Sequence, residues 1–369
     1  MIPVSEPCLA GREIELVTNA VRSGWVSSAG QYIEAFESGF AAYHDVKHCV
    51  ALANGTAALE VSLHALGIGP GDEVVIPSFT IMSLALAVLR VGAVPRLVDV
   101  DPDSWNLTAD GVRHVLTGRT RAIIVVHGFG QPADMDSILT LAKEHGLKVI
   151  EDAAESMGSR YRGQLCGTMG DVGSFSLYAN KLITTGEGGC ILTDNDGYAE
   201  RARRYINLYF GATERFSHEG LGYNFRMTNM QAALGVAQLE KIDTFAARKR
   251  EIGRWYAEEL AKCDTVDFQK TVGTVDHVFW MYCVLLRDDV RMSAMEAMAY
   301  LSDRGIGTRN LFKGLHTQVP LQPHLLAADR SAGYPVTERL YKRGFYLPSA
   351  VNLTRADVIM VVDALKDLG

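Results

Sequence analysis

The sequence predicts an α/β protein with one large, mostly parallel β-sheet and a smaller α+β region towards the C-terminus. Two observations support this fold class. Between residues 48 and 194, short apolar runs alternate with longer amphipathic runs, which is the pattern of βαβ units around a buried parallel sheet. The chain has 369 residues, which exceeds the roughly 250–300 residues at which a single hydrophobic core stops growing. We therefore expect two domains.

The large domain follows from the order of these runs. Apolar runs predict five strands, at 48–54, 72–77, 94–100, 121–127 and 147–152. Amphipathic runs between them predict four helices, at 55–67, 80–91, 110–116 and 135–146. Two more apolar runs, 174–178 and 189–194, are bounded by glycine rather than by helices, and they predict two further strands.

The C-terminal part has a different pattern. A strongly helical run at 227–260 leads out of the large domain. After it we expect a strand at 277–286 and helices at 293–304 and 354–368. We place the domain boundary near residue 240, so that 1–240 form the large α/β domain and 241–369 the small α+β domain.

Composition excludes several classes of protein. The 36 Lys and Arg residues are outnumbered by 43 Asp and Glu, for a net charge of −7. A mildly acidic chain without a basic block is not typical of a protein that binds nucleic acid. The most apolar stretch, 81–89, is too short to cross a membrane, and no signal peptide is visible.

The spacing of the cysteines and histidines does not indicate a metal site. The six cysteines are scattered without a C-x-x-C pair, as expected for reduced thiols in a cytoplasmic protein. The ten histidines contain no spaced pair of the kind that binds zinc, so we expect no metal site.

The loop Asn54-Gly55-Thr56-Ala57 lies between a predicted strand and a predicted helix. Free backbone N–H groups and the positive end of the helix dipole make such a position suitable for a phosphate. Thr56 could add a hydroxyl donor. The same residues are also compatible with an ordinary turn and helix cap.

Three acidic residues, Glu151, Asp152 and Glu155, stand at the end of the predicted strand 147–152. In open α/β sheets the carboxyl ends of the strands face the ligand crevice. A carboxylate there could pair with a protonated heterocyclic nitrogen, or it could simply cap a helix. His127 also ends a strand, and a catalytic and a structural role are equally compatible with its position.

Lys181 follows the strand 174–178 and precedes a glycine-rich run. A single lysine is usually a solvated surface charge. Here its neighbours include Phe175, Leu182 and Ile183, and burial among them would lower its pKa and make the amine a nucleophile. Ser176 could donate its hydroxyl to a phosphate.

Together, these motifs resemble those of the DegT/DnrJ/EryC1/StrS family of nucleotide-sugar aminotransferases. The resemblance covers nearly the whole chain. It is carried by Asn54-Gly55-Thr56-Ala57, by Glu151-Asp152-Ala153-Ala154-Glu155, by Ser174-Phe175-Ser176 with Lys181, by the glycine-rich run 185–189, and by Gly222-Tyr223-Asn224-Phe225-Arg226-Met227. It implies the aspartate aminotransferase-like fold type I of transferases that depend on pyridoxal 5'-phosphate (PLP).

The resemblance also implies roles around the PLP ring. Lys181 would bind the cofactor covalently, and it would then carry protons during the reaction. Asp152 would pair with the pyridinium nitrogen, and Glu155 would lie near the 3-hydroxyl.

Further roles concern the PLP phosphate and the assembly. Gly55, Thr56 and Ser176 would hold the phosphate. Asn224 would reach the phosphate of the neighbouring subunit, which implies a homodimer with shared active sites. From its sequence surroundings alone, Asn224 is a turn residue.

One departure from the family concerns the face of the PLP ring. Members usually carry an aromatic residue where this chain has Ile81, and that residue stacks on the ring. An aliphatic side chain still covers the ring, but it lacks the aromatic contribution of about 0.5–1.5 kcal/mol. The segment 309–316 resembles a sugar-binding segment with less proline than usual, and we expect Arg309, Lys313 and His316 to bind substrate there.

The resemblance implies amination at C4 of a nucleotide-linked 4-keto-6-deoxyhexose, with glutamate as amino donor. The resemblance of the residues around Lys181 further implies GDP-4-keto-6-deoxymannose as the favoured substrate, and a dTDP-linked 4-keto-6-deoxyglucose is second. A UDP-linked sugar and amination at C3 are further alternatives. A PLP-dependent sugar dehydratase would carry His in place of Lys181, and a non-catalytic regulatory homologue would not need the intact motifs.

Overall fold

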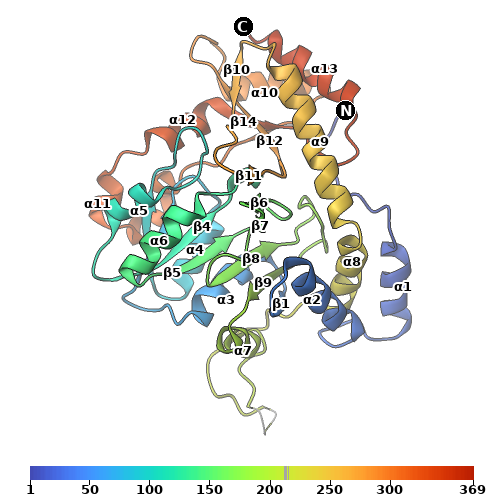
Figure 1. The fold of residues 1–369 in the computed structure, drawn as a ribbon, viewed down its shortest axis with the longest axis vertical. Coiled ribbons are helices and arrows are strands. Elements are labelled where there is room, and N and C mark those ends of the chain that lie inside the picture. Colours follow the sequence, from blue (N-terminus) through green and yellow to red (C-terminus); the bar gives the residue numbers. More distant parts are fainter. Residues whose placement is uncertain (212–213, 215) are drawn as a thin grey trace.

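The computed structural model describes residues 1–211, 214 and 216–369. Within them, a seven-stranded sheet has the order β1-β9-β8-β5-β4-β2-β3 (Figure 1). Its strands are β1 (His48–Leu52), β2 (Glu73–Pro77), β3 (Val94–Val98), β4 (Thr120–Val126), β5 (Lys148–Asp152), β8 (Val172–Ser176) and β9 (Gly189–Thr193). The pairs from β3 through β8 are parallel, whereas β9 runs antiparallel to β8 and β1. The expected mostly parallel sheet is confirmed.

Helices cover both faces of this sheet because its strands are apolar on both sides. Val74 and Ile76 of β2 pack with α3 (Gly55–Ala65) and α4 (Ser83–Arg90), whereas Val75 packs with α5 (Ala109–Val115) and α6 (Met135–His145). This alternation is the period of two expected of a β-strand. The predicted strands and helices between residues 48 and 152 all form, with ends shifted by a few residues.

Several helices were not expected from the sequence. They are α1 (Glu13–Arg22), α2 (Gln31–His44), α7 (Asp196–Tyr205), α11 (Ala327–Ser331), α12 (Pro335–Arg343) and the short 3-10 turns η1 (Gly128–Gly130), η2 (Leu315–Thr317) and η3 (Val319–His324). The helical run at 227–260 consists of two helices, α8 (Asn229–Leu239) and α9 (Ile242–Leu260).

The C-terminal region forms an antiparallel sheet, β10-β12-β14-β13, against helices α9, α10 and α13. The bounds are β10 (Val266–Phe268), β12 (Tyr282–Leu286), β13 (Arg309–Asn310), β14 (Gly344–Leu347), α10 (Ala294–Asp303) and α13 (Arg355–Lys366). A small third sheet joins β11 (Val275–Asp276), β6 (Arg160–Tyr161) and β7 (Gln164–Leu165). The predicted strand at 277–286 is wrong in its first half, because Phe279 adopts a left-handed φ of 52° that ends an extended strand.

The two regions are tied together at several points. Phe245 of α9 belongs to the core cluster of the large sheet, whereas Tyr256 of the same helix belongs to the C-terminal cluster. The first residues of the chain also lie with the C-terminal region, since Ile2 donates its N–H to the carbonyl of Gly305 at 2.7 Å, and both chain ends lie near α13 (Figure 1). The domain boundary near residue 240 stays a prediction.

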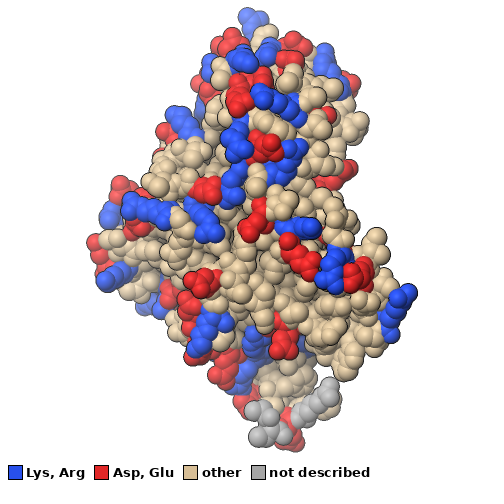
Figure 2. Space-filling model, turned by 45° about the vertical axis from the view of Figure 1, so that its right-hand side comes forward, with Lys and Arg blue, Asp and Glu red and all other residues tan. Residues whose placement is uncertain are grey.

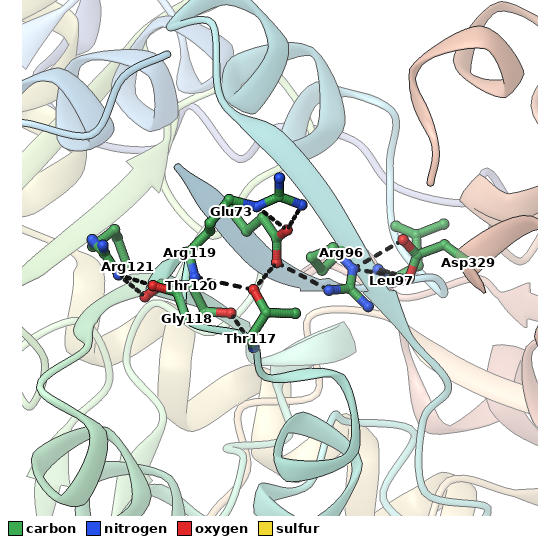
Figure 3. Close-up of polar contacts among 9 residues, drawn as sticks. All are labelled: Glu73, Arg96, Leu97, Thr117, Gly118, Arg119, Thr120, Arg121 and Asp329. Atoms are coloured by element: carbon green, nitrogen blue, oxygen red, sulfur yellow. Dashed lines mark hydrogen bonds and ion pairs between the residues drawn. The ribbon is translucent and has the colours of Figure 1, made fainter. Parts of the chain in front are cut away.

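A buried ionic cluster fixes the segment that follows β13 to the large sheet (Figure 3). Arg96 of β3 lies between Glu73 of β2 and Asp329 of α11, at 3.0 Å from each carboxylate. All three side chains are buried, and Arg119 adds a second cation to Glu73 at 2.7 Å. Buried charges are stable only when paired in this way. The cluster therefore holds α11 against β2 and β3 of the large sheet.

The surface carries both signs of charge, and Figure 2 shows a broad uncharged area in the lower half of one face. Among the residues that the structure describes, no helix is long and apolar enough to cross a membrane. The six cysteines are free thiols.

Candidate active site

A cavity of about 400 Å³ opens at the carboxyl ends of the parallel strands β2, β4, β5 and β8. This is the edge at which open α/β sheets bind ligands, and the size suits a small organic ligand. The cavity brings together eight of the residues predicted from the sequence: Gly55, Thr56, Ile81, Asp152, Glu155, Ser176, Lys181 and Arg309.

One end of the cavity is formed by the N-terminus of α3. Asn54 caps this helix, because its side-chain oxygen accepts the N–H of Ala57 at 2.8 Å. A Cβ on Gly55 would lie 2.7 Å from the Cβ of Ser176, so only glycine allows the helix to approach β8 so closely. Thr56 donates its hydroxyl to Ser83 at 3.0 Å. The helix dipole and these hydroxyl groups form a site suited to a phosphate.

The middle of the cavity holds two buried carboxyl groups. Asp152, at the end of β5, accepts an N–H from Ala154 at 3.1 Å. Burial raises its pKa, against the opposing effects of this N–H and of the Lys181 charge. Glu155 accepts the N–H of Phe129 at 2.8 Å, and burial raises the pKa of Glu155 to about 7. Both groups are therefore poised to bind a cation or a donor that enters the cavity.

Lys181 supplies an amine next to these carboxyl groups. Its side chain is partly buried, and its Nζ lies 3.9 Å from the centroid of the Trp280 ring. Burial lowers the pKa of Lys181, although the charges of Glu155 and Asp152 oppose this effect. An amine with a lowered pKa is a better nucleophile and base at neutral pH.

His127 and Glu151 lie behind the cavity rather than in its lining. The Nδ1 atom of His127 accepts the N–H of Ala133 at 3.1 Å, so its Nε2–H donates to Glu151 at 3.0 Å. Both ring nitrogens are thus used within the fold. Of the two roles that the sequence left open for His127, these contacts favour the structural one.

Three predicted site residues lie outside the lining of this cavity. Lys313 is exposed, one residue beyond Phe312, which does line it. His316 stacks on Tyr334 and shares a 2.7 Å hydrogen bond with Ser78. Asn224 is exposed on the segment that pairs with Asn207. The functional roles of these three residues stay predictions.

The cavity also contains residues that the sequence analysis did not single out. They include Thr80, Ser83, Tyr178, Asn180, Glu187, Trp280, Phe312 and Tyr346. Ser83 and Thr80 follow the end of a predicted parallel strand, which is a usable signal for a crevice residue. Trp280 carried no such signal, since it lay in the middle of a run that predicted a continuous strand.

Comparisons with known proteins agree with this site. The sequence model of the DegT/DnrJ/EryC1/StrS aminotransferase family matches residues 7–366. The chain is 42% identical to the GDP-perosamine synthase of Caulobacter vibrioides, over 100% of this chain and 98% of that protein. It is 38% identical to the GDP-perosamine synthase of Escherichia coli O157:H7, over 99% and 98%. The crystal structure of the aminotransferase TlmJ from Streptoalloteichus hindustanus superimposes with a TM-score of 0.91 at 32% identity, covering 100% and 98%.

The fold and the cavity define a PLP-dependent transferase of fold type I. The chain belongs to the DegT/DnrJ/EryC1/StrS aminotransferase family. It is an aminotransferase, and its cofactor is PLP.

The residues of the cavity fit this cofactor. PLP is a phosphate ester of a pyridine that carries a hydroxyl and an aldehyde. The cavity offers a helix N-terminus to the phosphate, a buried carboxyl group with a raised pKa to a ring cation, and a lysine amine to the aldehyde.

Proposed function

We propose that the protein transfers an amino group from glutamate to C4 of GDP-4-keto-6-deoxymannose, which gives GDP-perosamine for polysaccharide biosynthesis. The observation that carries this proposal is the 42% identity to a GDP-perosamine synthase along the whole chain. The intact set of Asp152 and Lys181 in one cavity supports catalysis rather than a regulatory role. Lys181 also argues against a sugar dehydratase, which would carry His at this position.

The residues of the cavity would have different roles in catalysis. When bound, PLP supplies an electron sink for the charge that develops on the carbon of the donor. Gly55, Thr56 and Ser176 would hold its phosphate, and Asp152 would keep its ring nitrogen protonated. Ile81, whose side chain is 51% exposed, would cover one face of the ring.

Lys181 is the group that moves protons. Its Nζ accepts a proton as a neutral amine and returns it as an ammonium, which is general base and general acid catalysis by one atom. The lowered pKa favours the neutral amine in the first of these steps. Glu155, with a pKa of about 7, would share a proton with the 3-hydroxyl at neutral pH.

Substrate binding needs local positive charge, because the nucleotide diphosphate is anionic and the chain carries a net charge of −7. Arg309 lines the cavity and Lys313 lies on the surface just beyond it. We expect one of them to meet the diphosphate. Replacing a residue that binds the phosphates uniformly raises KM more than it lowers kcat, so Arg309→Ala and Lys313→Ala can be compared directly.

We further propose that the enzyme is a homodimer whose sites are shared. Large apolar side chains stand exposed on or near α1, α8 and the cavity lining, and they include Ile14, Trp25, Ile81, Tyr178 and Met230. Such a surface is typical of an interface. Asn224 would cross it to reach the phosphate of the partner's PLP.

Subunit mixing tests the shared site. Lys181→Ala and Asn224→Ala subunits, each inactive alone, should regain activity when mixed, because each heterodimer carries one site with both groups intact. No recovery after verified subunit exchange would contradict the shared site.

We also propose a cytoplasmic location, which the six free thiols support.

The substrate is tested with a panel of nucleotide keto sugars. The enzyme, PLP and glutamate are mixed with GDP-linked, dTDP-linked or UDP-linked 4-keto and 3-keto sugars, and the 2-oxoglutarate formed is measured. The proposal requires the highest kcat/KM with GDP-4-keto-6-deoxymannose. Equal activity on GDP- and dTDP-linked sugars would contradict the choice of nucleotide but not the class of enzyme.

A further inference from the structure

The ring of Trp280 contacts the amine of Lys181, and Lys249 contacts the backbone of Trp280. Trp280 is 6% exposed and lines the cavity, while Lys249 of α9 is 4% exposed and does not belong to the cavity lining. We propose that Trp280 is a catalytic residue whose indole face receives the Lys181 ammonium each time this amine takes up a proton, and that Lys249 positions Trp280.

The ring of Trp280 lies directly against the amine of Lys181. The Nζ atom of Lys181 lies 3.9 Å from the centroid of the Trp280 ring, well within the roughly 6 Å over which a cation is attracted to an aromatic face. The negative face of the ring stabilises the ammonium but not the neutral amine. Trp280 therefore acts on one of the two states between which Lys181 alternates.

Two contacts fix the orientation of the Trp280 ring. Its Nε1–H donates to the carbonyl of Asn180 at 2.8 Å, which is the residue before Lys181. Trp280 also stacks on Phe129, with 6.3 Å between the ring centroids and 15° between the planes. The indole is thus fixed against both the backbone of Asn180 and the amine of Lys181.

The backbone of Trp280 is held by Lys249. Lys249 donates from Nζ to the carbonyl of Trp280 at 2.5 Å and to the carbonyl of Ser349. Among the described residues no carboxylate pairs with Lys249, and burial lowers its pKa to about 7. A buried lysine without a counter-ion is costly. Because Lys249 donates to the carbonyls of Trp280 and Ser349, it fixes the backbone of Trp280 relative to β14 and α9.

The consequence for the reaction rests on the proposed function. When the amino donor displaces Lys181, the freed amine must stay close, take a proton and give it back. The ring of Trp280 lowers the free energy of the protonated amine, while Asp152 and Glu155 act on the same charge from β5 and the loop after it. Trp280 would therefore raise the pKa of the freed Lys181 amine, which helps this amine to take up the proton before giving it back.

The test changes the electrostatics of the ring but not its shape. The protein is produced with mono-, di- or trifluorinated tryptophan, which progressively weakens the negative potential of the indole face. The cofactor is then removed, and the pKa of the Lys181 amine is measured by competitive acetylation and peptide mass spectrometry. We expect the pKa to fall stepwise with fluorine number, by about 0.4–1.5 pH units in total, as a cation–π interaction predicts.

The matched control is Trp280→Phe. All four tryptophans are fluorinated in the wild type, so the same series in Trp280→Phe isolates Trp280, and there the pKa of Lys181 should not respond. In Lys249→Met the response should be weaker, because the ring is no longer held. A pKa of Lys181 that is unmoved by fluorination in the folded wild type would overturn the proposal.

This measurement is independent of turnover. It is made on the protein without cofactor or substrate, so it can succeed even if the enzyme acts on another sugar, or fail while the aminotransferase assay succeeds. In the loaded enzyme, the acidic limb of the kcat–pH profile should shift in the same direction as the pKa of Lys181.

Discussion

Glu151 and Asp152 are neighbours on β5, yet their carboxyl groups have opposite environments. Glu151 accepts hydrogen bonds from His127 and from the backbone N–H groups of Gly167, Met169 and Gly170. These bonds outweigh the effect of burial and lower the pKa of Glu151. Asp152 accepts an N–H from Ala154 and faces the cavity, where burial raises its pKa. Because adjacent strand residues point to opposite sides, one acid supports the fold and the other remains available to a ligand.

The first prediction compares these two residues. Asp152→Asn should weaken PLP binding by about 1.5–3 kcal/mol, which raises the dissociation constant roughly 10- to 150-fold, because a charged hydrogen bond to the ring nitrogen is lost. Fluorescence titration of the cofactor-free protein measures this. Glu151→Gln is the matched control, and it should lower the free energy of unfolding but leave PLP affinity nearly unchanged. Equal effects on affinity would contradict the separate roles.

The second prediction concerns pH and Glu155. Its pKa is about 7 in the folded protein and 4.5 for an unperturbed glutamate. The folded state therefore binds the proton more tightly, so the contribution to stability is full below pH 4.5 and is lost as pH rises through about 7. The loss is on the order of 3 kcal/mol. In the cofactor-free protein, denaturant unfolding from pH 4.5 to 8 should show this decline in the wild type, and Glu155→Gln should lack it.

The third prediction uses Ile81. The side chain lines the cavity but is half exposed, so a larger residue has room. Ile81→Tyr should tighten PLP binding by about 0.5–1.5 kcal/mol, the worth of an aromatic contact. Ile81→Leu preserves size without a ring and should leave the affinity unchanged. If the Tyr and Leu variants bind PLP equally well, Ile81 does not cover the ring.

The fourth prediction concerns the buried cluster of Figure 3. Asp329→Asn leaves Arg96 paired only with Glu73 and should cost about 3–5 kcal/mol of stability, as for other broken buried ion pairs. It should also raise KM for the nucleotide sugar, because the segment that carries Arg309 is held less firmly. Arg339→Ala, which removes an exposed ion pair with Asp288, is a suitable control and should change neither quantity much. An unchanged KM in a folded Asp329→Asn enzyme would show that the cluster does not contribute to substrate binding.

The large, mostly parallel sheet was predictable because its signals are local. The βαβ pattern of residues 48–152 predicts the strands and helices along the chain, and the carboxyl ends of the parallel strands mark where Thr56, Asp152 and Ser176 must meet. The motif around Lys181 depends on a few consecutive residues. These features can be recognised in a single sequence because each depends on a short stretch of residues.

The remaining features depend on contacts that sequence spacing does not reveal. Arg96 and Asp329 are 233 positions apart, and nothing in either segment indicates the other. Trp280 lies in a run of apolar residues that predicted one continuous strand, whereas β12 begins only at Tyr282 and Trp280 lines the cavity. The role of Asn224 needs a second subunit, so the single chain leaves it a prediction.

The central claim is that Lys181 is the residue to which PLP attaches, and reduction tests it most directly. The purified enzyme with PLP should be yellow and should lose this colour on treatment with borohydride, which makes the attachment permanent. Peptide mass mapping should then place one pyridoxyl phosphate adduct on Lys181, and Lys181→Ala should carry none. An adduct on another lysine of the active wild-type enzyme would contradict the account of this site.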